Sequence, residues 1–148
     1  MLKHILIATD GSEAAQRASV YALELAAVHG ARVSALVATE PWSVLEMAHK
    51  AEAGAIHPLE DYEKARAKAA GRILDDVAAH AKERIIDCDL VHAADQHPAE
   101  AILAAARERA CDLIVMASHG RRGLDRILLG SQSAKVLALS AIPVLIHR

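Results

Sequence analysis

The chain has 148 residues, of which 53% are hydrophobic, 24% charged and 2% aromatic, and this predicts one globular domain over residues 1–148. Seventeen basic and nineteen acidic residues give a net charge of −2, so no overall positive field attracts nucleic acid or an anionic membrane. The scarcity of aromatic side chains also argues against binding of single-stranded nucleic acid by base stacking.

The N-terminal apolar run, residues 2–8, is too short and too soon followed by an acidic residue to be a secretory signal. No other window approaches the roughly 18 apolar residues of a membrane span. The two cysteines, Cys88 and Cys111, lie in apolar stretches, where a thiol packs as a small hydrophobe. A cytoplasmic protein with reduced thiols and no membrane partner is therefore expected.

Short apolar runs alternate with helix-forming stretches along the whole chain. Strands are expected at residues 2–8, 32–38, 85–92, 112–117 and Val144–His147. Helices are expected up to His29, with Gly30 as the stop, over 59–84, from Pro98 onwards, and over 132–139. Residues 39–57 lack a clean periodicity and form either a mobile excursion beside the site or a short helix that caps it.

Strands separated by helices cannot form hairpins, and each crossover returns the chain parallel and right-handed. The alternation therefore predicts an α/β fold, an open five-stranded parallel sheet with helices on both faces. Asp87 and Asp89 alternate with apolar residues and are expected on the wet face of an edge strand, not as a catalytic carboxylate pair.

The segment 116–133 carries the strongest functional signal, because it links the end of the fourth predicted strand to the start of the last helix. Open α/β sheets bind ligands at such carboxyl ends, and glycines with hydroxyl and N–H donors at a helix start suit phosphate. If the first and fourth strands are neighbours, Asp10 faces this segment. The groups of interest are Gly120, Arg121, Arg122, Gly130, Ser131, Gln132 and Ser133.

A purely structural interpretation of the same residues makes the glycines turn formers, Ser131 a helix cap and the arginines solvated surface. Asp10 can likewise cap the first helix, with Ser12 as the competing cap. No Walker A loop, nucleophile elbow or G-x-G-x-x-G turn occurs, which disfavours P-loop NTPase and α/β-hydrolase chemistry. The histidines have no companion ligands at a recognised metal spacing.

Several stretches together resemble the universal stress protein family along essentially the whole chain. They are Thr9-Asp10-Gly11-Ser12 after the first strand, Pro98-Ala99-Glu100 opening a helix, the glycine segment, and Pro143-Val144-Leu145-Ile146 at the end. The ATP-binding branch of that family carries G-x-x-G, nine residues and G-[ST]. Here the pattern falls on Ala117, Gly120, Gly130 and Ser131, so alanine replaces the first glycine.

The resemblance implies a flavodoxin-like or adenine nucleotide alpha hydrolase-like sheet in the order 3-2-1-4-5, with ATP as ligand. It places Asp10 near the ribose or a nucleotide-bound Mg²⁺, Val37 and Met116 beside the adenine, and the last helix against the phosphates. His119 is either a phosphate neighbour or proton donor, or a turn residue facing solvent. The implied nucleotide-binding residues are Ala8, Thr9, Asp10, Val37, Met116, Ala117, His119, Gly120, Arg121, Arg122, Gly130, Ser131, Gln132 and Ser133.

The expected function is that of an ATP-binding regulatory module of the stress response, with at most slow hydrolysis because no Walker-type lysine or general base is visible. The alternatives are a slow ATPase or self-phosphorylating protein, and a nucleotide-free dimeric scaffold if Ala117 closes the pocket. A flavin carrier has only Trp42 for ring stacking. A homodimer through the C-terminal strand Val144–His147 is expected, because that short apolar strand would lie at the edge of the sheet.

Overall fold

Strands and helices alternate along the chain as the apolar runs predict. The computed structural model describes residues 1–120 and 129–148. The strands are His4–Ala8 (β1), Arg32–Thr39 (β2), Cys88–Ala94 (β3), Leu113–Ala117 (β4) and Val144–His147 (β5). The helices are Glu13–His29 (α1), Val44–Glu52 (α2), Pro58–Glu83 (α3), Pro98–Glu108 (α4) and Ser131–Leu139 (α5).

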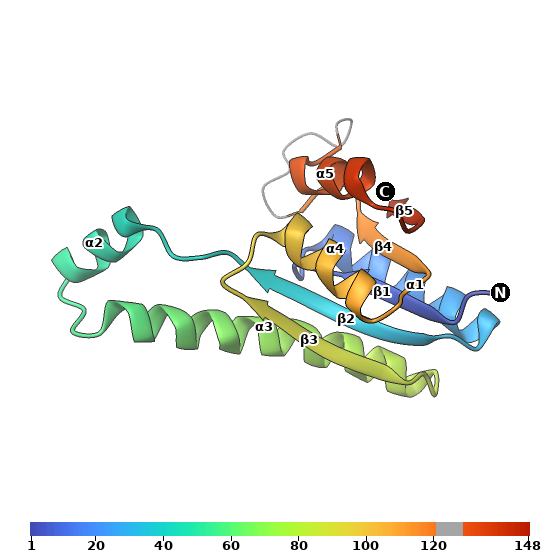
Figure 1. Ribbon diagram of the computed structural model, residues 1–148. Coiled ribbons are helices and arrows are strands. Elements are labelled where there is room, and N and C mark those ends of the chain that lie inside the picture. Colours follow the sequence, from blue (N-terminus) through green and yellow to red (C-terminus); the bar gives the residue numbers. More distant parts are fainter. Residues whose placement is uncertain (121–128) are drawn as a thin grey trace.

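The five strands form one parallel sheet in the order β3-β2-β1-β4-β5, which confirms the expected fold class and strand order (Figure 1). Helices α1 and α3 cover one face, and their core includes Ile5, Val33 and Val115. Helices α4 and α5 cover the other face over Leu6, Leu36 and other apolar side chains. Both faces are buried because each parallel crossover lays a helix on the sheet.

The third strand starts three residues later than the sequence predicts, at Cys88 instead of residue 85. Helix α3 ends in a Schellman turn, in which the Ile86 N–H donates to the Ala81 carbonyl at 3.0 Å. Ile85 takes the left-handed conformation of that turn, with φ of 56°. The apolar pair Ile85 and Ile86 therefore reverses the chain, and the prediction of strand at these residues was wrong.

Residues 39–57 contain the helix α2, Val44–Glu52, so the expected short helix is present, while its expected role as a cap of the site stays a prediction. The signal is a capping box, since the Ser43 side chain accepts from the Glu46 N–H while Glu46 accepts from the Ser43 N–H. Helix α2 packs on the start of α3, and Figure 1 shows it beyond the end of the sheet. Within the described residues its main packing partner is α3.

A polar network closes the amino end of the sheet. The buried His4 ring contacts the Arg109 carbonyl through Nδ1 and the Ser34 hydroxyl through Nε2, both at 2.9 Å. Arg109 also pairs with Asp89 at 3.2 Å, and Asp89 is exposed on the edge strand β3, as predicted. Burial lowers the pKa of His4 below its ordinary value, which keeps the imidazole neutral in the folded protein.

Cys111 is buried among the side chains under α4, which confirms its expected packing role. Burial raises its pKa to about 11, so the thiol is protonated at neutral pH. Among the helices of the described residues, none combines the length and the apolar character that crossing a membrane requires.

Candidate functional site

The turn between β1 and α1 holds Asp10 in a fixed position at the carboxyl end of the central strand. Asp10 Oδ1 accepts a hydrogen bond from the Ser12 N–H at 2.9 Å, and Thr9 Oγ1 accepts one from the Gly11 N–H at 3.2 Å. Gly11 has φ of 76°, a conformation that favours glycine. Ser12, not Asp10, caps α1 by accepting from the Ala15 N–H, so the capping alternative for Asp10 was wrong.

Strands β1 and β4 are neighbours, and this brings Asp10 against the glycine segment that follows β4. A Cβ built on Gly120 would lie 2.5 Å from Asp10 Oδ2, closer than real Cβ atoms approach another atom. The sequence analysis expected Asp10 to face this segment only if the first and fourth strands were neighbours, and the pairing of β1 with β4 fulfils that condition. Gly120 is the residue whose missing side chain leaves room for the Asp10 carboxylate.

The N-terminus of α5 is attached to the end of β4 by its backbone. The Gly130 N–H donates to the Ser118 carbonyl at 2.7 Å, and a Cβ on Gly130 would meet that oxygen at 3.2 Å and the Cα of His119 at 3.3 Å. Gly130 thus permits close packing of two backbones. The first N–H groups of any α-helix have no intrahelical acceptor, and within residues 1–120 and 129–148 no side chain caps the start of α5.

Two of the predicted phosphate-binding side chains are directed into the protein. The buried Ser133 hydroxyl donates to the Ala117 carbonyl at 2.9 Å, and the Gln132 side-chain oxygen accepts from the Ala99 N–H at 3.1 Å. Because both side chains bond within the protein, Gln132 and Ser133 can offer a ligand only their backbone N–H groups. Ser131 is exposed at the start of the helix.

Ala117 stands where the family pattern has glycine, and its methyl group packs against helix α1. It forms a small buried cluster with Ala14, Ala15 and Ala18. Ala117 is a residue of β4 and is not among the positive-φ residues of the chain. The alanine is therefore accommodated without backbone strain, on the side of the strand that faces α1.

The two side chains expected beside the adenine lie on opposite faces of the sheet. Val37 packs in the core under α1 and α3, whereas Met116 and Ala8 pack in the core under α4 and α5. The three side chains are buried, with Val37 3% exposed and the other two 7%. At Val37 the backbone, not the side chain, is the group that can reach the same ligand as Met116.

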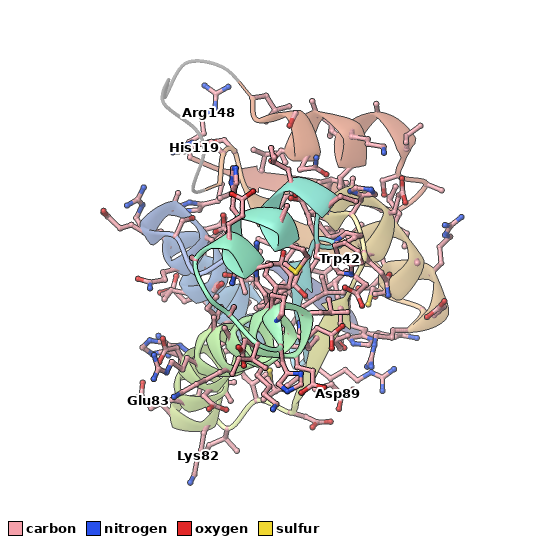
Figure 2. All side chains as sticks on the ribbon, turned by 90° about the vertical axis from the view of Figure 1, so that its left-hand side faces the viewer. Trp42, Lys82, Glu83, Asp89, His119 and Arg148 are labelled. Carbon is pink, nitrogen blue, oxygen red and sulfur yellow. The ribbon has the colours of Figure 1, made fainter. Side chains whose placement is uncertain are left out.

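Ser118 was not among the predicted site residues, although it lies between Ala117 and Gly120, on which the first two glycines of the family pattern fall. Its hydroxyl is 3.0 Å from Nδ1 of His119, and its N–H donates to the His147 carbonyl at 2.9 Å. Figure 2 accordingly shows His119 close to the last residue, Arg148. Arg121 and Arg122, which were predicted as phosphate neighbours, lie outside the described residues.

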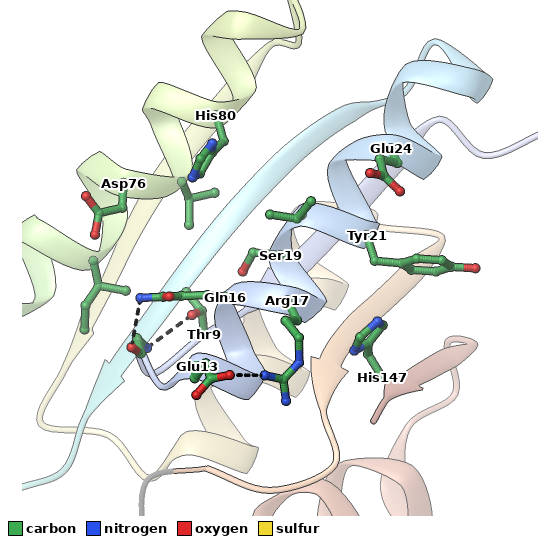
Figure 3. Close-up of a pocket in the computed structure, with 14 residues that line it drawn as sticks. Thr9, Glu13, Gln16, Arg17, Ser19, Tyr21, Glu24, Asp76, His80 and His147 are labelled. Atoms are coloured by element: carbon green, nitrogen blue, oxygen red, sulfur yellow. Dashed lines mark hydrogen bonds and ion pairs between the residues drawn. The ribbon is translucent and has the colours of Figure 1, made fainter.

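The described surface also has a hollow of about 600 Å³ over the outer side of α1, bordered by α3 and β5. Figure 3 shows Asp76 and His80 on α3 facing Gln16 of α1, with His147 on the other side of that helix. Of the predicted site residues that the structure describes, only Thr9 lines this hollow. The arrangement of Asp10, Gly120 and α5 is therefore a separate site.

Within the described residues, no group of three or more histidine, cysteine, aspartate or glutamate side chains is arranged to hold a metal ion. The Asp10 carboxylate lies beside Gly120 of the glycine segment. The residues present therefore suit a divalent cation that a phosphate chain brings with it, since the phosphates supply the other oxygen ligands.

The model of the universal stress protein family matches residues 1–148. A universal stress protein of Thermus aquaticus, named for the QAH/OAS sulfhydrylase 3′ region, is 39% identical over 148 residues that cover 100% of each chain. The universal stress protein YxiE of Bacillus subtilis is 32% identical over 155 residues, again with 100% of both chains covered.

Several solved structures share the fold of this chain over nearly its whole length. The structure of hypothetical protein MJ0577 superimposes with a TM-score of 0.80 at 26% identity, covering 99% of this chain and 96% of that one. A universal stress protein in complex with cAMP matches with a TM-score of 0.68 at 25% identity, covering 98% of this chain and 95% of that one. Another, from Archaeoglobus fulgidus in complex with dAMP, shares the fold at 16% identity, with a TM-score of 0.68 and 100% and 98% of the two chains covered.

Proposed function

Because the chain belongs to the universal stress protein family, we propose that it binds an adenine nucleotide, ATP with Mg²⁺, at Asp10, Gly120 and the first turn of α5. In this proposal the protein is a nucleotide-dependent regulatory module of the stress response. The observation that carries it is the juxtaposition of Asp10 and Gly120 at the paired ends of β1 and β4. The cAMP and dAMP complexes of its structural neighbours support an adenine nucleotide as the ligand class.

The chemistry of the two halves of the site suits a nucleotide. The Asp10 carboxylate is oriented by the Ser12 N–H through Oδ1, and a carboxylate is an acceptor for ribose hydroxyls. The first turn of α5 presents N–H groups and the positive end of the helix dipole, which favour phosphate oxygens. Gly120 and Gly130 carry no side chain, and this lets the Asp10 carboxylate, the end of β4 and the start of α5 lie close together.

If Mg²⁺ accompanies the nucleotide, Asp10 is the residue that would hold it, because carboxylate oxygens are the protein ligands that Mg²⁺ prefers. The ion would neutralise charge on the phosphates. The backbone N–H of Ser12 keeps this carboxylate oriented by donating to Oδ1.

The proposal includes at most slow hydrolysis of ATP. Residues 116–133 contain no lysine, and the first turn of α5 offers phosphate its backbone N–H groups and the exposed Ser131 hydroxyl. Such donors stabilise the ground state and the transition state nearly alike when no base activates the attacking water. Turnover in the ordinary enzyme range of about 1 to 1000 per second would contradict this part of the proposal.

We further propose that two copies associate through β5. This strand is at the edge of the sheet, its four residues are half-buried, and it pairs with β4 on one side only within the described residues. Antiparallel pairing with a second β5 about a two-fold axis would satisfy the N–H and C=O groups of the open edge.

Calorimetric titration with ATP and magnesium tests the nucleotide site. Saturable binding is expected, and analysis of small molecules released from the denatured protein should show an adenine nucleotide and no flavin. If millimolar ATP gives neither heat nor a thermal shift, and the protein releases no nucleotide, the nucleotide-free scaffold replaces this proposal.

A further inference from the structure

Helix α4 lacks a cap from its own N-terminal residues and receives one from helix α5. Its N-cap residue, His97, makes no side-chain capping bond. The Gln132 side chain supplies the acceptor, because its oxygen lies 3.1 Å from the N–H of Ala99 in the first turn of α4. Ala99 is fully buried, so without Gln132 this N–H would lose its partner away from water.

Gln132 belongs to the same first turn of α5 that presents N–H groups at the candidate site. This turn has two further attachments, from Gly130 N–H to the Ser118 carbonyl and from the Ser133 hydroxyl to the Ala117 carbonyl. Both of those run to the end of β4. The bond from Gln132 to Ala99 is the one that attaches the turn to a different element, α4.

The segment before α4 is attached in turn to the end of β2. The Gln96 N–H donates to the Thr39 carbonyl at 3.2 Å, and Asp95 has φ of 55°, a left-handed conformation that ends β3. Residues 95–99 therefore bridge the end of β2 and the first turn of α5. The phosphates are proposed to lie at the first turn of α5, and the end of β2 follows Val37, which the resemblance to the family places beside the adenine.

We propose that Gln132 is a positioning residue, which aims the N–H groups of the α5 first turn at the phosphates by bonding the backbone of α4. This inference rests on the proposed nucleotide site and changes the role of Gln132 within it. Its side chain acts through Ala99, and its own backbone N–H is the group offered to the ligand. The bond holds the phosphate side of the site and not the base.

The test uses the full chain with Gln132→Met, which keeps the length of the side chain and removes the acceptor. The affinities for ATP and for adenosine, which has no phosphate, are measured by calorimetry. We expect the ATP Kd to rise about five- to tenfold, the effect of losing one hydrogen bond, and the adenosine Kd to stay within about twofold. Hydrogen exchange of the Ala99 amide should accelerate.

Two further variants separate positioning from general packing of the helices. Lys135→Met removes the exposed contact between Lys135 and Glu100, 3.2 Å long, which also joins α5 to α4, and it should leave both affinities unchanged. Gln132→Glu retains an oxygen for Ala99 and should restore the slow exchange of that amide. If the Ala99 amide still exchanges fast in Gln132→Glu, the hydrogen bond from Ala99 to residue 132 is not what protects it, and the proposal is overturned.

The remaining outcomes are distinct. An unchanged ATP affinity in Gln132→Met, with wild-type protein that binds both ligands, overturns the positioning role alone. An equal loss of ATP and adenosine affinity also overturns it, because the substitution then acts on the fold as a whole. A wild-type protein that binds neither ligand refutes the proposed function itself, and the positioning role with it.

Discussion

Gly120 and Asp10 are 110 residues apart in the sequence, yet a Cβ on the glycine would lie 2.5 Å from the carboxylate of the aspartate. This proximity results from the pairing of β1 with β4, whose ends deliver the two residues to the same edge of the sheet. At Gly120, therefore, even the single methyl group of alanine would displace the Asp10 carboxylate of the proposed site.

Gly120→Ala should reduce nucleotide affinity at least tenfold while changing the unfolding free energy little. The added methyl group pushes the Asp10 carboxylate away from its position, and Gly120 itself is exposed. Calorimetry with ATP and urea denaturation measure the two effects.

Gly71→Ala is the matched control for this substitution. Gly71 lies in the interior of α3, and its added Cβ meets no atom within 4 Å. The control should keep the ATP affinity and gain about 0.5–1 kcal/mol of stability, because alanine is the better helix former. An ATP affinity in Gly120→Ala equal to that of the control would contradict the placement of Asp10 in the site.

Gly130→Val should weaken nucleotide binding and also lower the stability of the protein. Its side chain would press on the Ser118 carbonyl and the His119 Cα, which lie 3.2 and 3.3 Å from a Cβ at this position. Thermal unfolding and calorimetry should show both losses together. A variant with wild-type melting temperature and no ATP binding would instead mean that the side chain fills the phosphate space without disturbing α5.

The stability of the protein should fall as the pH drops below about 6.5, the ordinary pKa of histidine. Burial lowers the pKa of His4 in the folded protein, so between that lowered value and 6.5 the unfolded chain binds a proton that the folded chain does not. The free energy of unfolding therefore decreases on acidification. Urea denaturation at pH 7.5 and pH 5.5 measures this dependence.

His4→Gln should show a weaker pH dependence over the same range, although its stability at pH 7.5 is lower because contacts to Arg109 and Ser34 are altered. The other eight histidines are retained in this variant and provide the internal reference. An unchanged slope between pH 7.5 and 5.5 would assign the effect to those residues and not to His4.

Ile85→Gly should stabilise the protein by about 1 kcal/mol. The isoleucine has φ of 56° and is 96% exposed, so glycine relieves the left-handed strain without removing any packing. Ile85→Ala keeps a Cβ and should recover less. Urea denaturation of the two variants and the wild type measures this effect. A glycine variant no more stable than the wild type would show that Ile85 carries no such strain.

The open edge of β5 predicts different results for two neighbouring proline substitutions. The carbonyls of Pro143 and His147 accept from β4, so the backbone of Leu145, which is in phase with them, also faces β4. Leu145→Pro should therefore disrupt the sheet within one copy. Ile146→Pro removes an N–H that points to the open edge, and should yield folded monomer by light scattering.

A wild-type protein that is monomeric at high micromolar concentration would refute the association through β5 whatever the variants do. A dimeric Ile146→Pro protein would place the interface elsewhere on the molecule.

The sequence by itself was sufficient for the parallel sheet, and it predicted that Asp10 would lie near the glycine segment if β1 and β4 paired, as they do. Apolar runs such as Val144–His147, separated by helical stretches, predict parallel crossovers, whereas the order of the strands was implied only by the resemblance to the family. Asp10, Gly120 and Gly130 could be selected because turns and close backbone approaches restrict which residue types fit them. The capping box at Ser43 was a local signal that could also have been used.

Only the tertiary structure decided which way the side chains of the site point. Parallel strands are buried on both faces and show no polar alternation, so nothing in the sequence marks Val37 and Met116 as lying on opposite faces. Gln132 bonds Ala99, 33 residues away, because α4 and α5 pack side by side on the sheet. Such contacts depend on the packing of helices that are distant in the chain, and local residue preferences do not encode them.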